Sequence, residues 1–168
     1  LTEFNLDYMR MRRSALRLLE DAGLMRPNFS DQMNIYAMLS QLRGTINTDR
    51  FNEIKKRIYD KVQTIETEAA ERAELMPGAK ETLYQLRQMK KKIVVVTNNG
   101  RLGTDRTLER LNLAGVFDAV LTRDDVDELK PDPGIVLKAL NIAGAKTDEA
   151  ILVGDAIIDI RAAKAASV

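Results

Sequence analysis

The sequence predicts an α/β protein with a doubly wound parallel-sheet core and an inserted α-helical cap. Two observations support this prediction. Residues 1–75 have the apolar spacing of helices throughout, whereas residues 76–168 alternate short β-branched runs with helical stretches, and the pattern changes near Pro77-Gly78. Strands of continuous apolar character that are separated by helices are typical of a parallel sheet covered on both faces. We therefore expect a cap over residues 1–75 and a core over residues 76–168.

Three helices are expected in the cap. The first runs from Tyr8 to Ala22, Ser30 is the expected N-cap of the second, and Thr48 that of the third. The third helix carries one apolar stripe, which is typical of packing between helices. Its members are Phe51, Ile54, Ile58, Val62, Ile65 and Ala69.

The core is expected to contain three strands with helices between them. The strands are the apolar runs 93–96, 119–122 and 151–153, and the helices cover about 79–90, 101–113, 134–143 and 157–166.

Composition excludes several classes of function. The 168 residues contain 26 Lys and Arg against 25 Asp and Glu, and a net charge of +1 gives no field that would hold nucleic acid. With neither cysteine nor histidine present, catalysis would depend on carboxylates, hydroxyls and amines. Every apolar run is short, far below the roughly 20 residues of a membrane span, and no signal peptide is recognisable. We expect a cytoplasmic protein with neither nucleic acid nor membrane as partner.

Polar residues follow each expected strand. Thr97-Asn98 follows the first, Lys130-Pro131 comes after the second, and Asp155 and Asp159 follow the third. Each set also has a purely structural explanation. The first set could form a turn, Lys130 could be a solvated charge, and the two aspartates could stabilise the start of a helix. Ligands bind outside the carboxyl ends of the strands in open parallel sheets, so the three sets together predict a functional site.

These segments resemble the motifs of the haloacid dehalogenase superfamily. Val94–Asn98 is similar to the second motif of that family, Leu129–Pro133 to the Lys-Pro form of the third, and Val153–Asp159 to the fourth. The resemblance covers Met76–Val168. The preceding helical segment lies where the phosphoglycolate-phosphatase-like branch inserts a helical cap.

The resemblance implies a Mg²⁺-dependent phosphatase that acts on a small phosphorylated metabolite through an aspartyl-phosphate intermediate. Thr97, with backbone N–H groups around Asn98, would bind phosphoryl oxygens, and Lys130 would neutralise the phosphate charge. Asp155 would hold Mg²⁺, while Asp159 would bind the ion through water or orient Asp155.

One motif of the family is missing. No Asp-x-Asp-x-Thr follows an apolar strand, and Thr2-Glu3-Phe4 is typical of the sequence directly after that motif. We therefore expect the nucleophilic aspartate upstream of Leu1, with its strand and a C-terminal strand outside residues 1–168, and we expect residues 1–168 to be inactive by themselves. The resemblance places the nucleophile strand between the strands that end at Thr97 and Gly154.

Other functions stay open at this point. A non-catalytic relative that binds a phosphorylated ligand or partner explains the missing motif directly, and a phosphomutase shares every motif visible in the sequence. A response-regulator-like receiver also combines Asp, Thr and Lys, but the helical insertion and the order of the motifs argue against it. The sequence indicates neither the particular substrate nor the oligomeric state.

Overall fold

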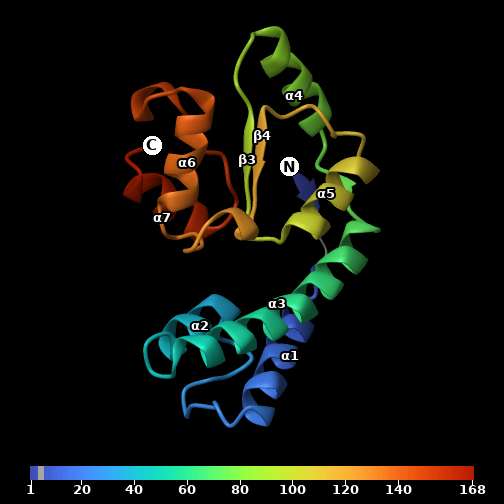
Figure 1. Ribbon diagram of the computed structural model, residues 1–168. Coiled ribbons are helices and arrows are strands. Elements are labelled where there is room, and N and C mark those ends of the chain that lie inside the picture. The colour runs from blue at the N-terminus through green and yellow to red at the C-terminus, as the bar shows by residue number, and fades with distance from the viewer. Residues whose placement is uncertain (4–5) are drawn as a thin grey trace. The chain divides into compact units, whose positions relative to one another are not determined.

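The computed structural model describes residues 1–3 and 6–168 and divides into two compact units (Figure 1). One is a helical unit, Asn5–Arg72, and the other is an α/β unit formed by Leu1–Phe4 and Ala73–Val168. The boundaries therefore differ from the expected cap over residues 1–75, because both ends of that segment group with the core.

A pair of short strands explains this difference. β1 (Thr2–Glu3) pairs antiparallel with β2 (Glu74–Leu75), with Thr2 opposite Leu75. The prediction that residues 1–75 are helical throughout is thus wrong at both ends. A strand of two residues has no period that could be recognised in a sequence. Phe4, which follows Thr2-Glu3 in the segment typical of the sequence after the missing motif, lies outside the described residues.

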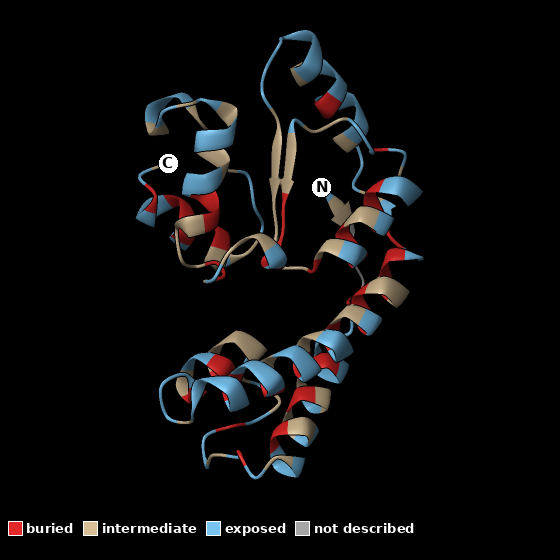
Figure 2. Cartoon of the chain, in the orientation of Figure 1, coloured by how far each residue is buried: buried red, intermediate tan, exposed pale blue. Residues whose placement is uncertain are grey.

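The helical unit contains α1 (Tyr8–Asp21), α2 (Ile35–Leu42) and α3 (Thr48–Ala70). Every member of the apolar stripe expected on α3 is buried, which confirms its assignment as a packing face. In Figure 2 the buried residues of α1 and α3 lie where the two helices face each other. α1 contributes Met11, Ala15 and Leu19 to this core.

Asparagine side chains cap two of these helices. Asn34 accepts from Ala37 N at 2.7 Å and begins α2, so the expected start at Ser30 was four residues early. Asn47 accepts from Arg50 N at 2.8 Å, which makes Thr48 the first helical residue of α3 rather than its cap. A side-chain oxygen at the N-cap satisfies a backbone N–H group that has no partner within the helix.

The α/β unit is built on a parallel pair of strands. β3 (Val94–Val96) pairs with β4 (Ala119–Leu121), and Val95 lies opposite Val120. The helices of this unit are α4 (Ala79–Gln88), α5 (Arg101–Arg110), α6 (Gly134–Ala143) and α7 (Ile157–Ala165), with short 3₁₀ turns η1 (Arg123–Asp125) and η2 (Thr147–Glu149).

Helices cover both faces of this pair (Figure 1). On one face, Val94, Val96 and Leu121 pack with residues of α6 and α7, around the fully buried Ile135. On the other face, Val120 packs with Leu83 of α4 and Leu108 of α5. Successive strand residues alternate between the two helical layers, and both faces are apolar because both are buried. The predicted α/β class with helices on both sides of a parallel sheet is confirmed.

The third strand predicted for the core does not form. Residues 151–153 belong to no strand, and the side chains of Ile151 and Val153 are 90% and 92% exposed. An apolar β-branched run becomes a strand only when a neighbour completes its ladder of hydrogen bonds. Within residues 1–3 and 6–168 no segment pairs with this run, so β3 and β4 are the two strands of the expected parallel sheet that form in the described part of the chain. Among the helices described, none is both long and apolar enough to cross a membrane.

Asp118 holds the amino end of β3. Its carboxylate accepts hydrogen bonds from Ile93 N at 2.8 Å, from Lys92 Nζ at 3.0 Å and from Arg87 Nη1 at 2.9 Å. The backbone hydrogen bond from Ile93 and the contact with Lys92 lower the pKa of Asp118 to about 2, against the opposing effect of burial. The carboxylate therefore binds its neighbours best in the ionised form.

Stability should depend on Asp118 in acid. Because its folded pKa lies below the unfolded value of 3.8, its contribution is complete above about pH 4 and disappears as the pH falls towards 2. We expect Asp118→Asn to lower the melting temperature at pH 7, with the difference from the unmodified protein shrinking as the pH falls from about 4 towards 2. Thermal unfolding followed between pH 2 and 7 measures this. Asp127→Asn, the same change at an exposed aspartate, is the matched control for these measurements.

Candidate functional site

The turn after β3 carries the first candidate residue, Thr97. Its backbone N–H donates to Leu121 O at 2.9 Å, which extends the pairing with β4 to the end of the strand. Its hydroxyl oxygen accepts from Asn99 N at 3.1 Å, an interaction that closes the turn. Because a hydroxyl both accepts and donates, the proton of Thr97 remains available to an oxygen of a ligand.

Asn98 joins this turn to the segment that contains Lys130. The Asn98 side-chain oxygen accepts from Lys130 N at 3.1 Å, and its side-chain nitrogen donates to Lys130 O at 3.0 Å. Both polar groups of the carboxamide are thus bonded to the main chain of one residue. The turn and the Lys-Pro segment, 32 residues apart in the sequence, are held together at this point.

The Lys130 ammonium group is buried beside a carboxylate. Its Nζ donates to Asp159 Oδ1 at 2.6 Å and to Val96 O at 3.0 Å. The side chains of Lys130 and Asp159 are only 8% and 10% exposed. An ammonium group has three N–H bonds, so two are directed to these oxygens and the third can serve a ligand. The arrangement fixes a positive charge at the carboxyl end of β3.

Asp159 also shapes the segment before α7. Its Oδ2 accepts from Ala156 N at 3.1 Å, which caps the start of the helix. The Asp159 side chain packs directly against Gly154, where an added Cβ would lie 2.5 Å from Asp159 Cβ. Glycine is therefore the residue that this approach requires.

Asp155 lies between these residues but is exposed, and its carboxylate has no partner among the described residues. The structure thus connects Thr97, Asn98, Lys130 and Asp159 through hydrogen bonds and adjacent residues, while Asp155 stands next to them in sequence without joining the network.

These residues fit part of a Mg²⁺ shell. Mg²⁺ takes one or two carboxylates and keeps several waters, and an exposed carboxylate such as that of Asp155 suits this role. Both oxygens of Asp159 already accept hydrogen bonds, which favours a role in holding the segment that carries Asp155. In the described part of the chain, no three residues of the types Asp, Glu, His and Cys form a group that could hold a metal ion by themselves.

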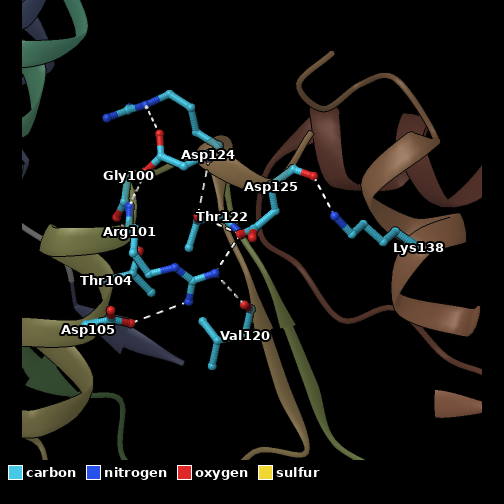
Figure 3. Close-up of polar contacts among 10 residues, drawn as sticks. Gly100, Arg101, Thr104, Asp105, Val120, Thr122, Asp124, Asp125 and Lys138 are labelled. Atoms are coloured by element: carbon cyan, nitrogen blue, oxygen red, sulfur yellow. Dashed lines mark hydrogen bonds and ion pairs between the residues drawn. The ribbon is translucent and has the colours of Figure 1, made fainter. Parts of the chain in front are cut away.

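A second polar network adjoins the site at the end of β4 (Figure 3). The Arg101 guanidinium donates to Asp125 Oδ2 at 2.6 Å and to Val120 O at 2.8 Å. Asp124 Oδ2 accepts from Arg101 N at 2.7 Å, at the start of α5. Thr122, which is completely buried, completes a capping box with Asp125. This network fixes the end of β4 to the start of α5.

Burial raises the pKa of Asp125, but hydrogen bonds from the Thr122 backbone and hydroxyl and the charge of Arg101 outweigh this effect and lower it. The carboxylate is therefore ionised, and its Oδ2 accepts from both groups of Thr122 and from Arg101, which indicates a structural rather than a catalytic role. Lys138 adds a contact from α6 by donating to Asp125 O at 2.7 Å.

Several of these contacts were not predicted from the sequence. The capping box of Thr122 and Asp125 has a recognisable spacing, so it could have been found. The buried Arg123, whose guanidinium donates to Asn98 O at 3.4 Å, has no signal in the sequence, because a charged residue normally indicates an exposed position. The close approach of Gly154 to Asp159 likewise depends on the fold alone.

Curated relatives of the chain include two named phosphatases. A segment of 80 residues is 40% identical to "Pyrophosphatase PpaX" of Bacillus cereus, covering 48% of this chain and 37% of the relative. A segment of 120 residues is 31% identical to "Phosphoglycolate phosphatase" of Nitrosococcus oceani, covering 68% of this chain and 53% of the relative. The matches thus span about half or less of these relatives.

Solved structures of similar fold include a HAD-superfamily hydrolase, subfamily IA, variant 1, from Geobacter sulfurreducens PCA. Its TM-score is 0.60 with 26% sequence identity, over 96% of this chain and 80% of that one. The sequence pattern of the haloacid dehalogenase-like hydrolases matches residues 26–168, most of the chain. This chain therefore belongs to the haloacid dehalogenase-like hydrolase family.

Proposed function

We propose that the protein is a Mg²⁺-dependent phosphomonoester hydrolase that acts on a small phosphorylated metabolite through an aspartyl-phosphate intermediate. The observation that carries this proposal is the buried Lys130 ammonium group, held by Asp159 and Val96 beside Thr97. A fixed cation and a hydroxyl at the carboxyl end of a parallel strand are suited to a phosphoryl group. The named activities of the relatives support the same chemistry.

Each site residue has a distinct task in this proposal. Thr97 donates its hydroxyl proton to a phosphoryl oxygen, and Lys130 directs its third N–H bond towards the same group. Both contacts strengthen in the transition state, as negative charge gathers on the phosphoryl oxygens. Because Lys130 and Thr97 are held by neighbours before substrate arrives, little reorganisation is needed at the moment of reaction. The nucleophilic aspartate of the proposed intermediate is a separate residue from these.

Asp155 would hold Mg²⁺, with Asp159 fixing the segment that presents it. The ion supplies charge neutralisation to the transferring phosphoryl group when it is bound. Asp159 contributes by accepting from Ala156 N, next to Asp155, and by pairing with Lys130. The cytoplasmic location expected from the sequence stays a prediction.

Product analysis tests the proposal. The full-length protein should release inorganic phosphate from at least one phosphomonoester in a panel containing phosphoglycolate, sugar phosphates and nucleotides, and only with Mg²⁺ present. Conversion of a sugar phosphate into its isomer without phosphate release would identify a phosphomutase instead. Saturable binding of a panel member with neither reaction would identify a non-catalytic binding protein.

Replacement of Asp155 tests the metal assignment. We expect Asp155→Asn to reduce Mg²⁺-dependent turnover by more than the roughly 10- to 100-fold typical for loss of an outer-shell partner. Its stability without metal should stay within about 0.5 kcal/mol, because the side chain is exposed. Mg²⁺ should raise the melting temperature of the unmodified protein, and this rise should be lost in the variant. Asp148→Asn, at another exposed aspartate, should retain it; an equal rise in Asp155→Asn would rule out the assignment.

A further inference from the structure

The Asn98 side chain is committed to the main chain of Lys130. Its orientation is unambiguous, because the backbone N–H of Lys130 can only donate and the backbone C=O can only accept. A carboxamide has one acceptor oxygen and one donor nitrogen, and both are used on the same residue. A substrate contact through either group would compete with one of these bonds.

The position of Lys130 is consequently fixed at two places. Asn98 holds its main chain against the turn after β3, and Val96 O and Asp159 hold its ammonium group at the far end of the side chain. The four methylene groups between these two places have a limited reach, so a main-chain shift beyond what they can absorb would move the ammonium group or break its contacts. The two hydrogen bonds to Asn98 hold the main chain of Lys130 against such a shift.

We infer that Asn98 is a positioning residue, whose side chain acts on phosphoryl transfer only by holding Lys130 and not by contacting the substrate. This inference rests on the proposed phosphatase function for its kinetic consequences. Its structural content, that Asn98 determines where the Lys130 ammonium group lies, is independent of that function.

A double-mutant cycle separates positioning from substrate contact. Asn98→Ala should lower kcat by about 10²-fold, the typical cost of a misplaced catalytic group, with KM changed much less. In a Lys130→Met background the same change should have no further effect on kcat, because there is no ammonium group left to position. Independent effects that multiply in the double variant would overturn the inference. The control Asn99→Ala should stay close to the unmodified enzyme, since Asn99 makes its hydrogen bonds through the backbone.

An isosteric variant guards against loss of folding in Asn98→Ala. Asn98→Asp keeps the shape and the acceptor for Lys130 N, but it replaces the donor to Lys130 O by a second acceptor. It should also lower kcat at neutral pH, where the carboxylate is ionised. An unchanged kcat in this variant would show that the donated bond does not matter and would overturn the inference.

Crystal structures of both Asn98 variants give a readout that needs no activity. We expect the Lys130 Nζ to leave its position 2.6 Å from Asp159 Oδ1. If Lys130 and Asp159 stay in place in these structures, the inference is wrong, whatever the effect of the variants on kcat. If the unmodified protein hydrolyses no phosphomonoester but Lys130 moves in the variants, the proposed function fails while the positioning role stands.

Discussion

Lys130→Met is expected to destabilise the protein by about 3–5 kcal/mol and to reduce phosphomonoester hydrolysis by about 10²-fold or more. Removing the ammonium group leaves the carboxylate of Asp159 buried without its partner at 2.6 Å. The same change removes a fixed positive charge from the place where phosphoryl oxygens would bind. Chemical denaturation measures the first effect, and kcat measures the second.

A double variant separates these two consequences. Lys130→Met with Asp159→Asn removes both charges, and the asparagine oxygen can still accept from Ala156 N. Stability should therefore recover much of the loss, while hydrolysis should not. Lys164→Ala, at an exposed lysine of α7, should change neither property appreciably. Full activity and stability in Lys130→Met would contradict the assigned role of the ion pair.

Gly154→Ala is expected to destabilise the protein by about 1–3 kcal/mol and to lower activity as well. The new methyl group would lie 2.5 Å from Asp159 Cβ and 2.6 Å from Asp159 Oδ2. Asp159 cannot rotate away cheaply, since both of its oxygens are bonded. Any displacement of its carboxylate weakens the contact with Lys130, so one added methyl group disturbs the cation of the site.

The cause of the Gly154 effect can be isolated in an Asp159→Gly background. This change removes the three atoms that would lie nearest to the new methyl group, all of which belong to the Asp159 side chain. Gly154→Ala should therefore cost much less stability there than in the unmodified protein, as urea denaturation can measure. An equal cost in both backgrounds would mean that crowding against Asp159 is not the reason for glycine at position 154.

The class of fold and most of its helices could be predicted from the sequence. The stripe on α3, the alternation after Pro77 and the start of α6 at Gly134 follow from local periodicity and from backbone preferences, which each segment carries within itself. The sequence also shows which residue types lie at the carboxyl ends of the expected strands, because these residues directly follow the apolar runs along the chain. It did not determine the cap of α2, where Asn34 rather than Ser30 satisfies the free backbone N–H groups.

The connections between the candidate residues could not be predicted from the sequence, because they depend on the tertiary structure. Residues 151–153 have the composition of a strand, but a strand requires a partner, and no described segment supplies one. The bonds of Asn98 to Lys130 and of Lys130 to Asp159 join residues about 30 positions apart. Burial then makes these contacts strong, because a charge removed from water must be paired. Such pairing depends on distances in space, which the periodicity of a sequence does not contain.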